Sequence, residues 1–177
     1  ISVLLYSSPG VGKTTILKIL HEQNILCERG SEIGKDLYYE RKLQTAKQGH
    51  NFEFEIAHKE LARDHQFATY EGTIAIETWH PGNIAYAKIR NAEVVPQLMQ
   101  CAKQSPFIKK AVGIWLRVPK GVIKQRTQTF KDESDWAADF YTKIDEQIEP
   151  ILRELQLFER VHVVDANRPF DEVLQDV

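Results

Sequence analysis

Short apolar stretches alternate along the chain with longer segments in which apolar residues recur every three or four positions. Several of the short stretches are rich in β-branched residues, which is typical of strands that are covered on both faces. They lie at residues 1–6, 24–27, 73–77, 111–118 and 161–165. The longer segments predict helices at residues 14–22, 33–49, 54–70, 82–104, 122–130, 135–155 and 170–177.

This alternation predicts one α/β domain over residues 1–177. Strands that are joined by helical crossovers pair in parallel, so we expect a three-layer fold with a five-stranded parallel sheet and helices on both faces. In such sheets the functional site lies beyond the carboxyl ends of the strands. The residues that follow each strand are therefore the first candidates for chemistry.

A glycine-rich loop follows the first predicted strand. Residues 7–15 read SSPGVGKTT and stand directly before a predicted helix. Glycines let backbone N–H groups approach a phosphate, and the positive end of the helix dipole attracts the same anion. A phosphate-binding loop is therefore predicted, with Ser7 in place of its usual first glycine and with its core at Pro9, Gly10, Val11, Gly12, Lys13, Thr14 and Thr15. In this interpretation Lys13 contacts the β- and γ-phosphates of ATP, and the Thr14 hydroxyl binds Mg²⁺.

Ionisable and aromatic side chains follow the second and third predicted strands. Glu77 is the strongest candidate for a catalytic carboxylate, because it would lie beside the phosphate loop and hold Mg²⁺ or accept a proton. Glu28 and Arg29 can orient a hydroxyl or hold a phosphate, or form a surface charge pair. Trp79 can line an acceptor pocket or pack against the next helix, and His80 is expected to cap a helix or face solvent.

Three further regions can contact a nucleotide. Arg63, on a predicted helix, faces either a bound base or phosphate or, by default, solvent. A polar stretch within residues 124–140 suits a mobile lid over the phosphates, from which Arg126 would reach the nucleotide or the transferring phosphoryl group. After the last strand, Ala166 and Asn167 belong to a loop that can cradle a purine base through its backbone.

Composition sets limits on partners and location. The chain has 177 residues, 42% of them hydrophobic, and a formal net charge of −2, which gives no overall attraction to nucleic acid or to an acidic membrane. We therefore expect no nucleic-acid partner. We also expect no membrane partner, since no apolar run approaches the length of a membrane span. Cys27 and Cys101 have no metal-like spacing, and Cys27, in an apolar stretch, is expected to be a buried thiol. A reducing, cytoplasmic compartment fits this cysteine usage.

Taken together, these segments resemble the thymidylate kinase branch of the P-loop nucleoside and nucleotide kinases, in order and over nearly the whole chain. Residues 28–35 look like the Arg-Glu-Pro-Gly-Gly-Thr-Pro-Leu-Gly segment of that family, and residues 77–79 stand where it has Asp-Arg-Tyr. Residues 83–86 resemble its Ser-Leu-Ala-Tyr. Towards the C-terminus, similarity extends to the turn before the lid, a Leu-Asp-Phe-Phe stretch and an Ile-Asp-Ala turn near the adenine, at residues 116–122, 135–141 and 164–167.

The resemblance implies a Mg²⁺- and ATP-dependent kinase with a small-molecule acceptor, and a homodimer is common in that family. The arginine that the family places after its catalytic acid is Thr78 here, with Arg29 or Arg41 as the candidate replacement. Nucleoside kinases of the same superfamily use a glutamate after the second strand as the base for a sugar hydroxyl, a role that Glu28 would fit. The acceptor is thus a nucleoside monophosphate or a nucleoside. Two further interpretations stay open, a non-catalytic nucleotide-binding regulator and an ATPase acting on a macromolecule.

Overall fold

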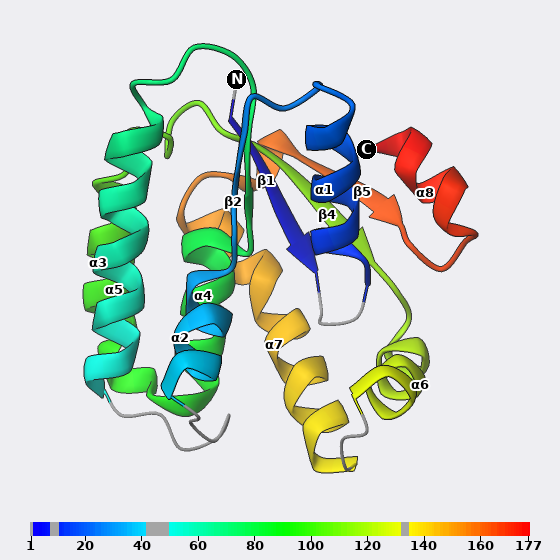
Figure 1. Ribbon diagram of the computed structural model, residues 1–177. Coiled ribbons are helices and arrows are strands. Elements are labelled where there is room, and N and C mark those ends of the chain that lie inside the picture. The colour runs from blue at the N-terminus through cyan, green and yellow to red at the C-terminus, as the bar shows by residue number, and fades with distance from the viewer. Residues whose placement is uncertain (1, 8–10, 42–49, 132–134) are drawn as a thin grey trace.

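Five strands form one parallel sheet in the computed structural model, which describes residues 2–7, 11–41, 50–131 and 135–177 (Figure 1). The strands are β1 (Ser2–Ser7), β2 (Glu28–Gly30), β3 (Ile74–Glu77), β4 (Val112–Arg117) and β5 (Val161–Asp165). Their order across the sheet is β2-β3-β1-β4-β5, and every neighbouring pair is parallel. The strand that precedes the glycine-rich loop is therefore the central one.

Helices cover both faces of the sheet. Figure 1 shows α1 and α8 on the face towards the viewer, α4 and α7 on the other face, and α3 with α5 at the side of β2. The helices are α1 (Lys13–Glu22), α2 (Ile33–Arg41), α3 (His50–Phe67), α4 (Trp79–Arg90), α5 (Val95–Lys103), α6 (Lys120–Lys131), α7 (Asp135–Glu154) and α8 (Phe170–Asp176), with short 3-10 turns η1 (Ala92–Val94) and η2 (Phe158–Arg160). Within the described ranges, no helix has both the length and the apolar character needed to cross a membrane.

The register of the sheet places the site. Leu5 of β1 pairs with Glu77 of β3, and on the other side Ser7 pairs with Leu116 of β4. The ends of these strands therefore lie at one edge of the sheet, with the head of α1 between them. This edge is where a parallel α/β sheet places its ligands.

The core forms where amphipathic helices meet the sheet. In α7, Ile144, Ile148 and Ile151 recur at three- and four-residue intervals and are all buried. This spacing puts them on one helical face, which packs inward. On the opposite side of the sheet, Ile16 and Leu17 of α1 are buried and hold that helix against the strands. The helix that follows the glycine-rich loop is thus anchored to the sheet by apolar contacts.

The second strand differs from the prediction, because it is Glu28–Gly30 and not the apolar stretch at residues 24–27. Residues 24–27 form the connection after α1, where the backbone N–H of Ile25 donates to the Leu20 carbonyl at 3.0 Å. Cys27 lies in this connection and is exposed, so the expected buried thiol is wrong. Because the strand lies further along the chain than predicted, different residues follow its carboxyl end.

The helix expected at residues 82–104 is two helices, α4 and α5, joined by η1. Asn91 ends α4 with φ −145° and ψ 61°, a conformation outside the helical region. Pro96, in the first turn of α5, lacks an N–H and suits a helix start better than an interior. The helix expected at residues 33–49 ends at Arg41, and residues 42–49 lie outside the described residues.

Candidate active site

The head of α1 lies at the carboxyl end of the central strand. The helix begins at Lys13 after Gly12, whose φ of 101° is in the left-handed region that favours glycine. The first helical hydrogen bond runs from the Ile16 N–H to the Gly12 carbonyl at 2.9 Å. The N-terminus of this helix therefore presents its N–H groups and its positive dipole end to an anion. Lys13 is almost completely buried at this point.

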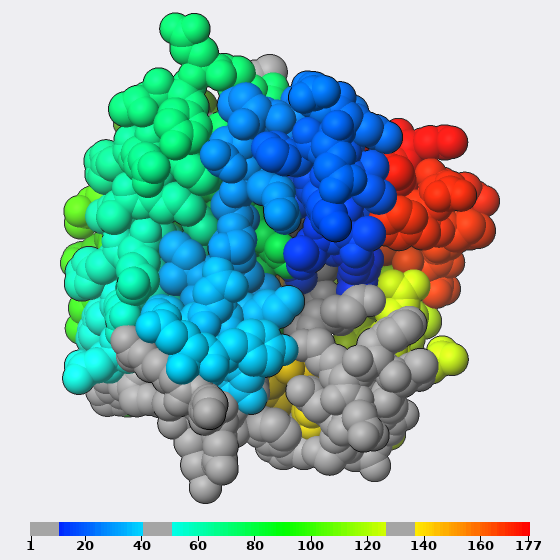
Figure 2. Space-filling model, in the orientation of Figure 1, coloured from blue at the N-terminus to red at the C-terminus, as the bar shows by residue number. Residues whose placement is uncertain are grey.

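The rest of the predicted phosphate loop is only partly described. Val11 is buried and Thr15 is exposed, whereas Pro9 and Gly10 lie outside the described residues. A Cβ on Gly12 would lie 3.5 Å from the Phe170 ring, so the start of α8 is close to this loop. In Figure 2 the surfaces of α1 and α2 adjoin on the same face of the molecule.

Thr14 and Glu77 meet where α1 approaches the end of β3. The Thr14 Oγ1 hydroxyl donates to Glu77 Oε1 at 2.7 Å. Glu77 is the last residue of β3 and is only 6% exposed, while Thr14 is exposed. Hydroxyl and carboxylate oxygens are the hard ligands that Mg²⁺ prefers, and Mg²⁺ is commonly held by one or two such groups together with nucleotide phosphates. These two side chains therefore fit a Mg²⁺-nucleotide.

The surroundings of Glu77 shift the pKa of its carboxyl in opposite directions. Burial raises the pKa of the Glu77 carboxyl, and the nearby Glu32 carboxylate raises this pKa further. Lys13, the hydrogen bond from Thr14 and, more weakly, Lys35 lower the same pKa. Two lysines and two glutamates therefore share one electrostatic environment at this edge of the sheet.

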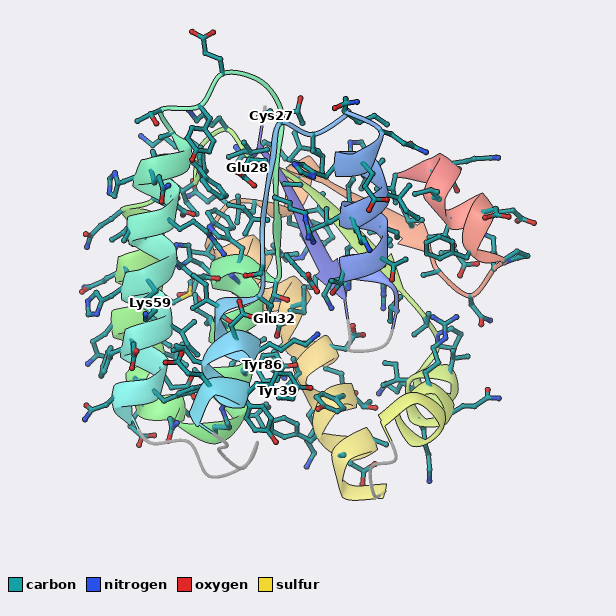
Figure 3. The ribbon with its side chains drawn as sticks, viewed as in Figure 1. Cys27, Glu28, Glu32, Tyr39, Lys59 and Tyr86 are labelled. Atoms are coloured by element: carbon teal, nitrogen blue, oxygen red, sulfur yellow. The ribbon has the colours of Figure 1, made fainter. Side chains whose placement is uncertain are left out.

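The structure separates Glu28 from this group, so the expectation that Glu28 ends the second strand is wrong. Glu28 begins β2 and pairs with Ile74, at the opposite end of β3 from Glu77. Its carboxylate accepts a hydrogen bond from the N–H of Arg29 at 2.9 Å, and the Arg29 residue is exposed. Figure 3 shows Glu28 at the start of β2 and Glu32 beyond its end. The place that was predicted for Glu28 is taken by Glu32.

The structure brings neither Trp79 nor Arg63 into an open acceptor pocket. Trp79 is fully buried, and its indole Nε1 donates to Asp64 Oδ2 at 2.8 Å, so it packs behind the site. The Arg63 side chain is 11% exposed, and its Nη1 donates to the Ser31 carbonyl at 2.7 Å. Arg63 therefore holds the segment after β2 and does not lie on a solvated surface. Arg41 ends α2, and its side chain lies outside the described part of the chain.

Arg126, Ala166 and Asn167 lie together beyond the carboxyl end of β5. Arg126 belongs to α6, and its Nη2 donates to the Ala166 carbonyl at 3.0 Å. The Ala166 N–H donates to the Arg117 carbonyl at 2.8 Å, and the Asn167 N–H donates to Asp165 Oδ1 at 2.9 Å. The loop after β5 is therefore fixed to β4 and to α6. The lid expected at residues 124–140 is largely the end of α6 and the start of α7, and residues 132–134 lie outside the described residues.

Buried acids on α3 are the main feature that the sequence interpretation missed. Glu60 and Asp64 are fully buried, and His80, expected to cap a helix or face solvent, is 2% exposed between them. A signal was present, because both acids lie at helical spacing from the buried residues Ile56 and Phe67. Acidic residues on an apolar helix face indicate buried partners.

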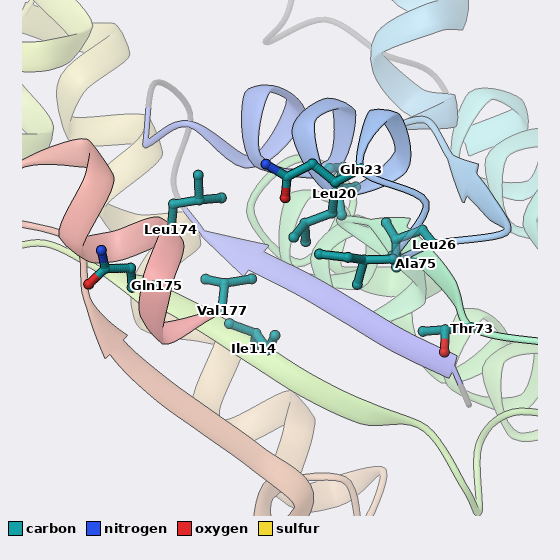
Figure 4. Close-up of a pocket in the computed structure, with 11 residues that line it drawn as sticks. Leu20, Gln23, Leu26, Thr73, Ala75, Ile114, Leu174, Gln175 and Val177 are labelled. Carbon is teal, nitrogen blue, oxygen red and sulfur yellow. The ribbon is translucent and has the colours of Figure 1, made fainter.

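A separate apolar pocket lies between α1, α8 and the sheet (Figure 4). Its volume is about 490 Å³, and its lining includes Leu20 of α1, Ala75 of β3, Ile114 of β4 and Leu174 of α8. Thr73, which precedes β3, also lines it, so the pocket extends to the edge of the sheet opposite Glu77. None of the residues predicted to bind the nucleotide or acceptor lines this pocket.

Comparison with known proteins gives a likeness in structure alone. No known family model and no curated protein sequence matches the chain. Two structures of NadR protein, one in complex with NR and one with NAD and AMP-PNP, both match with a TM-score of 0.72, at 13% and 14% identity. These matches cover 96% and 93% of this chain but only 46% and 44% of the NadR chains. The chain thus spans slightly less than half the length of NadR.

Two other solved structures match over almost all of both chains. Deoxyadenosine kinase from M. mycoides, solved with its products dCMP and dCDP, has a TM-score of 0.67 at 14% identity, over 99% of this chain and 95% of its own. A gluconokinase from Sinorhizobium meliloti has a TM-score of 0.58 at 12% identity, over 99% of this chain and 87% of its own. Two of these neighbours are named as kinases, and the likeness does not single out a thymidylate kinase branch. The chain therefore shares the α/β fold of these solved structures.

Proposed function

We propose that this chain is a Mg²⁺- and ATP-dependent phosphotransferase that phosphorylates a small nucleoside-like acceptor. The observation that carries the proposal is the 2.7 Å hydrogen bond between the Thr14 hydroxyl and the Glu77 carboxylate, beside the buried Lys13 at the head of α1. This arrangement joins a phosphate-binding helix end to a carboxylate on the neighbouring strand. Neighbours of the same fold that hold AMP-PNP or deoxynucleotides support it.

Each residue at the head of α1 has a distinct role in this proposal. Lys13 neutralises the β- and γ-phosphates, and the N–H groups that open α1 bind their oxygens. Thr14 and Glu77 would hold the Mg²⁺ ion, which supplies charge neutralisation of the phosphates when it is bound. The loop of Ala166 and Asn167 would contact the purine, and Arg126 fixes that loop from α6. In this proposal α6 and the start of α7 form the lid.

Described arginines give little support to a phosphate on the acceptor. Arg63 is occupied by the Ser31 carbonyl and Glu60, Arg29 is the middle residue of β2, and residue 78 is threonine. Glu32 lies on the acceptor side together with Lys35, and its carboxylate would repel a phosphate more than a neutral hydroxyl. A nucleoside acceptor is therefore favoured over a nucleoside monophosphate, for which Arg41 would be the candidate cation.

The reaction then needs one proton acceptor. The acceptor hydroxyl oxygen forms a bond to the γ-phosphorus, the bond from that phosphorus to the β–γ bridging oxygen breaks, and ADP leaves with the bond's electron pair. The hydroxyl proton passes to the Glu32 carboxylate, which stands in the position predicted for Glu28. Positioning and charge stabilisation supply most of the rate enhancement in such transfers.

The test is ADP release from Mg²⁺-ATP in the presence of a panel of nucleosides and nucleoside monophosphates. Lys13→Ala is expected to lower acceptor-dependent turnover by about a thousandfold while the protein stays folded. Lys18→Ala is the matched control, because Lys18 is an exposed lysine on the same helix whose ion pair is with Glu22. Equal activity in both variants would refute the proposed site. ATP binding with no acceptor-dependent turnover would favour a nucleotide-binding regulator, and acceptor-independent hydrolysis would favour an ATPase.

A further inference from the structure

A group of buried ionisable side chains lies directly behind the candidate site. His80 Nδ1 is 3.3 Å from Glu60 Oε2, and His80 Nε2 is 3.2 Å from Asp64 Oδ2. Asp64 Oδ2 also accepts hydrogen bonds from Trp79 Nε1 at 2.8 Å and from Ser105 Oγ at 2.5 Å. We call Glu60, Asp64 and His80 the α3 cluster. Apolar residues of similar size often stabilise an interior as well as buried ions do, so core stability alone does not explain this group.

One arm of the α3 cluster reaches the segment after β2. Arg63 Nη2 lies 3.4 Å from Glu60 Oε1, and Arg63 Nη1 donates to the Ser31 carbonyl at 2.7 Å. Ser31 immediately precedes Glu32, so this contact fixes the backbone that carries the acceptor-side carboxylate. A side chain on Gly30 would come within 3.2 Å of the Arg63 guanidinium, which shows how closely Arg63 crosses the end of β2.

The other arm reaches the turn after β3. Thr78 and Trp79 have φ values of 67° and 50°, in the left-handed region that non-glycine residues rarely adopt. Such a conformation costs free energy and persists only where its surroundings hold it. The bonds from Asp64 to the Trp79 and His80 side chains supply this restraint directly after Glu77.

We propose that the α3 cluster is a positioning device that sets the segments carrying Glu32 and Glu77 relative to one another. The proposal rests on the proposed function, since it assigns these two carboxylates to the acceptor and to Mg²⁺. One helix thereby holds the ends of two strands that receive different substrates. The cluster touches neither substrate, so its members are positioning residues and not catalytic ones.

The test compares Asp64→Asn and Arg63→Met with Glu53→Gln. Glu53 is a matched control because it lies on the same helix, is 2% exposed and accepts hydrogen bonds from Arg90 and Asn91, at 2.8 Å from Arg90 Nε. Each variant is assayed for thermal stability, for kcat and KM towards ATP and the acceptor, and for the Mg²⁺ dependence of ADP affinity.

The two arms predict different kinetic changes. Asp64→Asn weakens the restraint after Glu77, so we expect kcat to fall by about a hundredfold and ADP binding to need about tenfold more Mg²⁺. Arg63→Met releases the segment before Glu32, so the acceptor KM should rise by about tenfold while the KM for ATP stays within about twofold. Arg63→Lys keeps a donor for the Ser31 carbonyl and should recover part of the acceptor affinity.

Two outcomes would overturn the positioning role. In the first, the loss of activity is explained by the loss of stability. Asp64→Asn and Arg63→Met then keep as much activity as a Glu53→Gln variant that is destabilised to the same extent. The other is an unchanged Mg²⁺ dependence in Asp64→Asn. If Asp64→Asn does not fold, Trp79→Phe removes a single donor from Asp64 and is judged by the same two criteria.

Failure of the proposed function gives a different result. Wild-type protein that binds ADP with Mg²⁺ but phosphorylates no acceptor would refute the phosphotransferase, while the Mg²⁺ dependence of Asp64→Asn would still decide whether the cluster positions Glu77. Wild-type protein whose ADP binding does not depend on Mg²⁺ would overturn both proposals.

Discussion

Glu77 is the residue at which burial and nearby charge compete most directly. Burial raises the pKa of its carboxyl, whereas Lys13 and the Thr14 hydroxyl favour the ionised form that a metal ligand requires. The folded chain therefore holds this carboxyl group in a poorly solvated place, beside two groups that favour its ionised form. Such an arrangement is characteristic of groups that serve binding or catalysis and not stability.

We expect Glu77→Gln to lower phosphoryl transfer by at least about a hundredfold without destabilising the protein at neutral pH. Because the folded-state pKa is raised, the folded state binds more protons than the unfolded state between the ordinary glutamate pKa and the raised one. Ionisation of Glu77 therefore lowers the free energy of unfolding as pH rises through that window, and glutamine escapes this loss. Turnover and urea unfolding at pH 5 and pH 8 measure both effects. If Glu77→Gln lowers the free energy of unfolding enough to explain its loss of activity, Glu77 is a structural residue.

Among the elements, the β3–α4 junction is the most constrained. A Cβ on Gly82 would lie 2.3 Å from Thr78 Cγ2, a distance that no pair of non-bonded carbon atoms tolerates. Gly82→Ala must therefore displace Thr78, and we expect it to lower the free energy of unfolding by about 1–3 kcal/mol. Thr78→Gly removes the clash and suits the φ of 67°, so the double variant should recover much of the loss. Urea unfolding of the wild type, the two single variants and the double variant gives the coupling energy between the two positions. If the two changes in the free energy of unfolding simply add, this account is wrong.

The elements also show where sequence patterns succeed and fail. The strands β1, β3, β4 and β5 lie within about one residue of the predicted stretches, and the complete burial of β3 agrees with the apolar run that predicted it. The strand β2 is displaced, since its three residues, Glu-Arg-Gly, include no apolar side chain and give no strand signal in the sequence. The apolar signal before it belongs to the connection after α1. This displacement is what moved the acceptor-side carboxylate from Glu28 to Glu32.

At the scale of the whole molecule, topology predicted more of the site than side-chain pattern did. Thr14 and Glu77 are 63 positions apart, and they were expected together only because adjacent parallel strands end at one edge. The rule about the ends of parallel strands says nothing of α3, because α3 is a helix that packs behind the site. There, Arg63 was expected to face solvent by default, whereas it contacts Glu60, and Glu60 and Asp64 are buried among polar partners. Buried polar networks depend on which helices meet, and a single sequence does not give this.

Binding of a Mg²⁺-nucleotide should therefore be measurable as stability of the entire fold. A ligand that binds only the folded state at about 100 times its Kd adds about 2.7 kcal/mol. For a chain of this size, that corresponds to a rise in Tm of about 5–10 °C. We expect this rise with ADP and Mg²⁺, a smaller one with ADP and EDTA, and almost none in Lys13→Ala. Differential scanning fluorimetry over a series of ADP concentrations tests this expectation, because a true site gives a shift that grows with the logarithm of ligand concentration. A shift that is equal with and without Mg²⁺ would mean that Thr14 and Glu77 bind no metal, and their hydrogen bond would then only join α1 to the sheet.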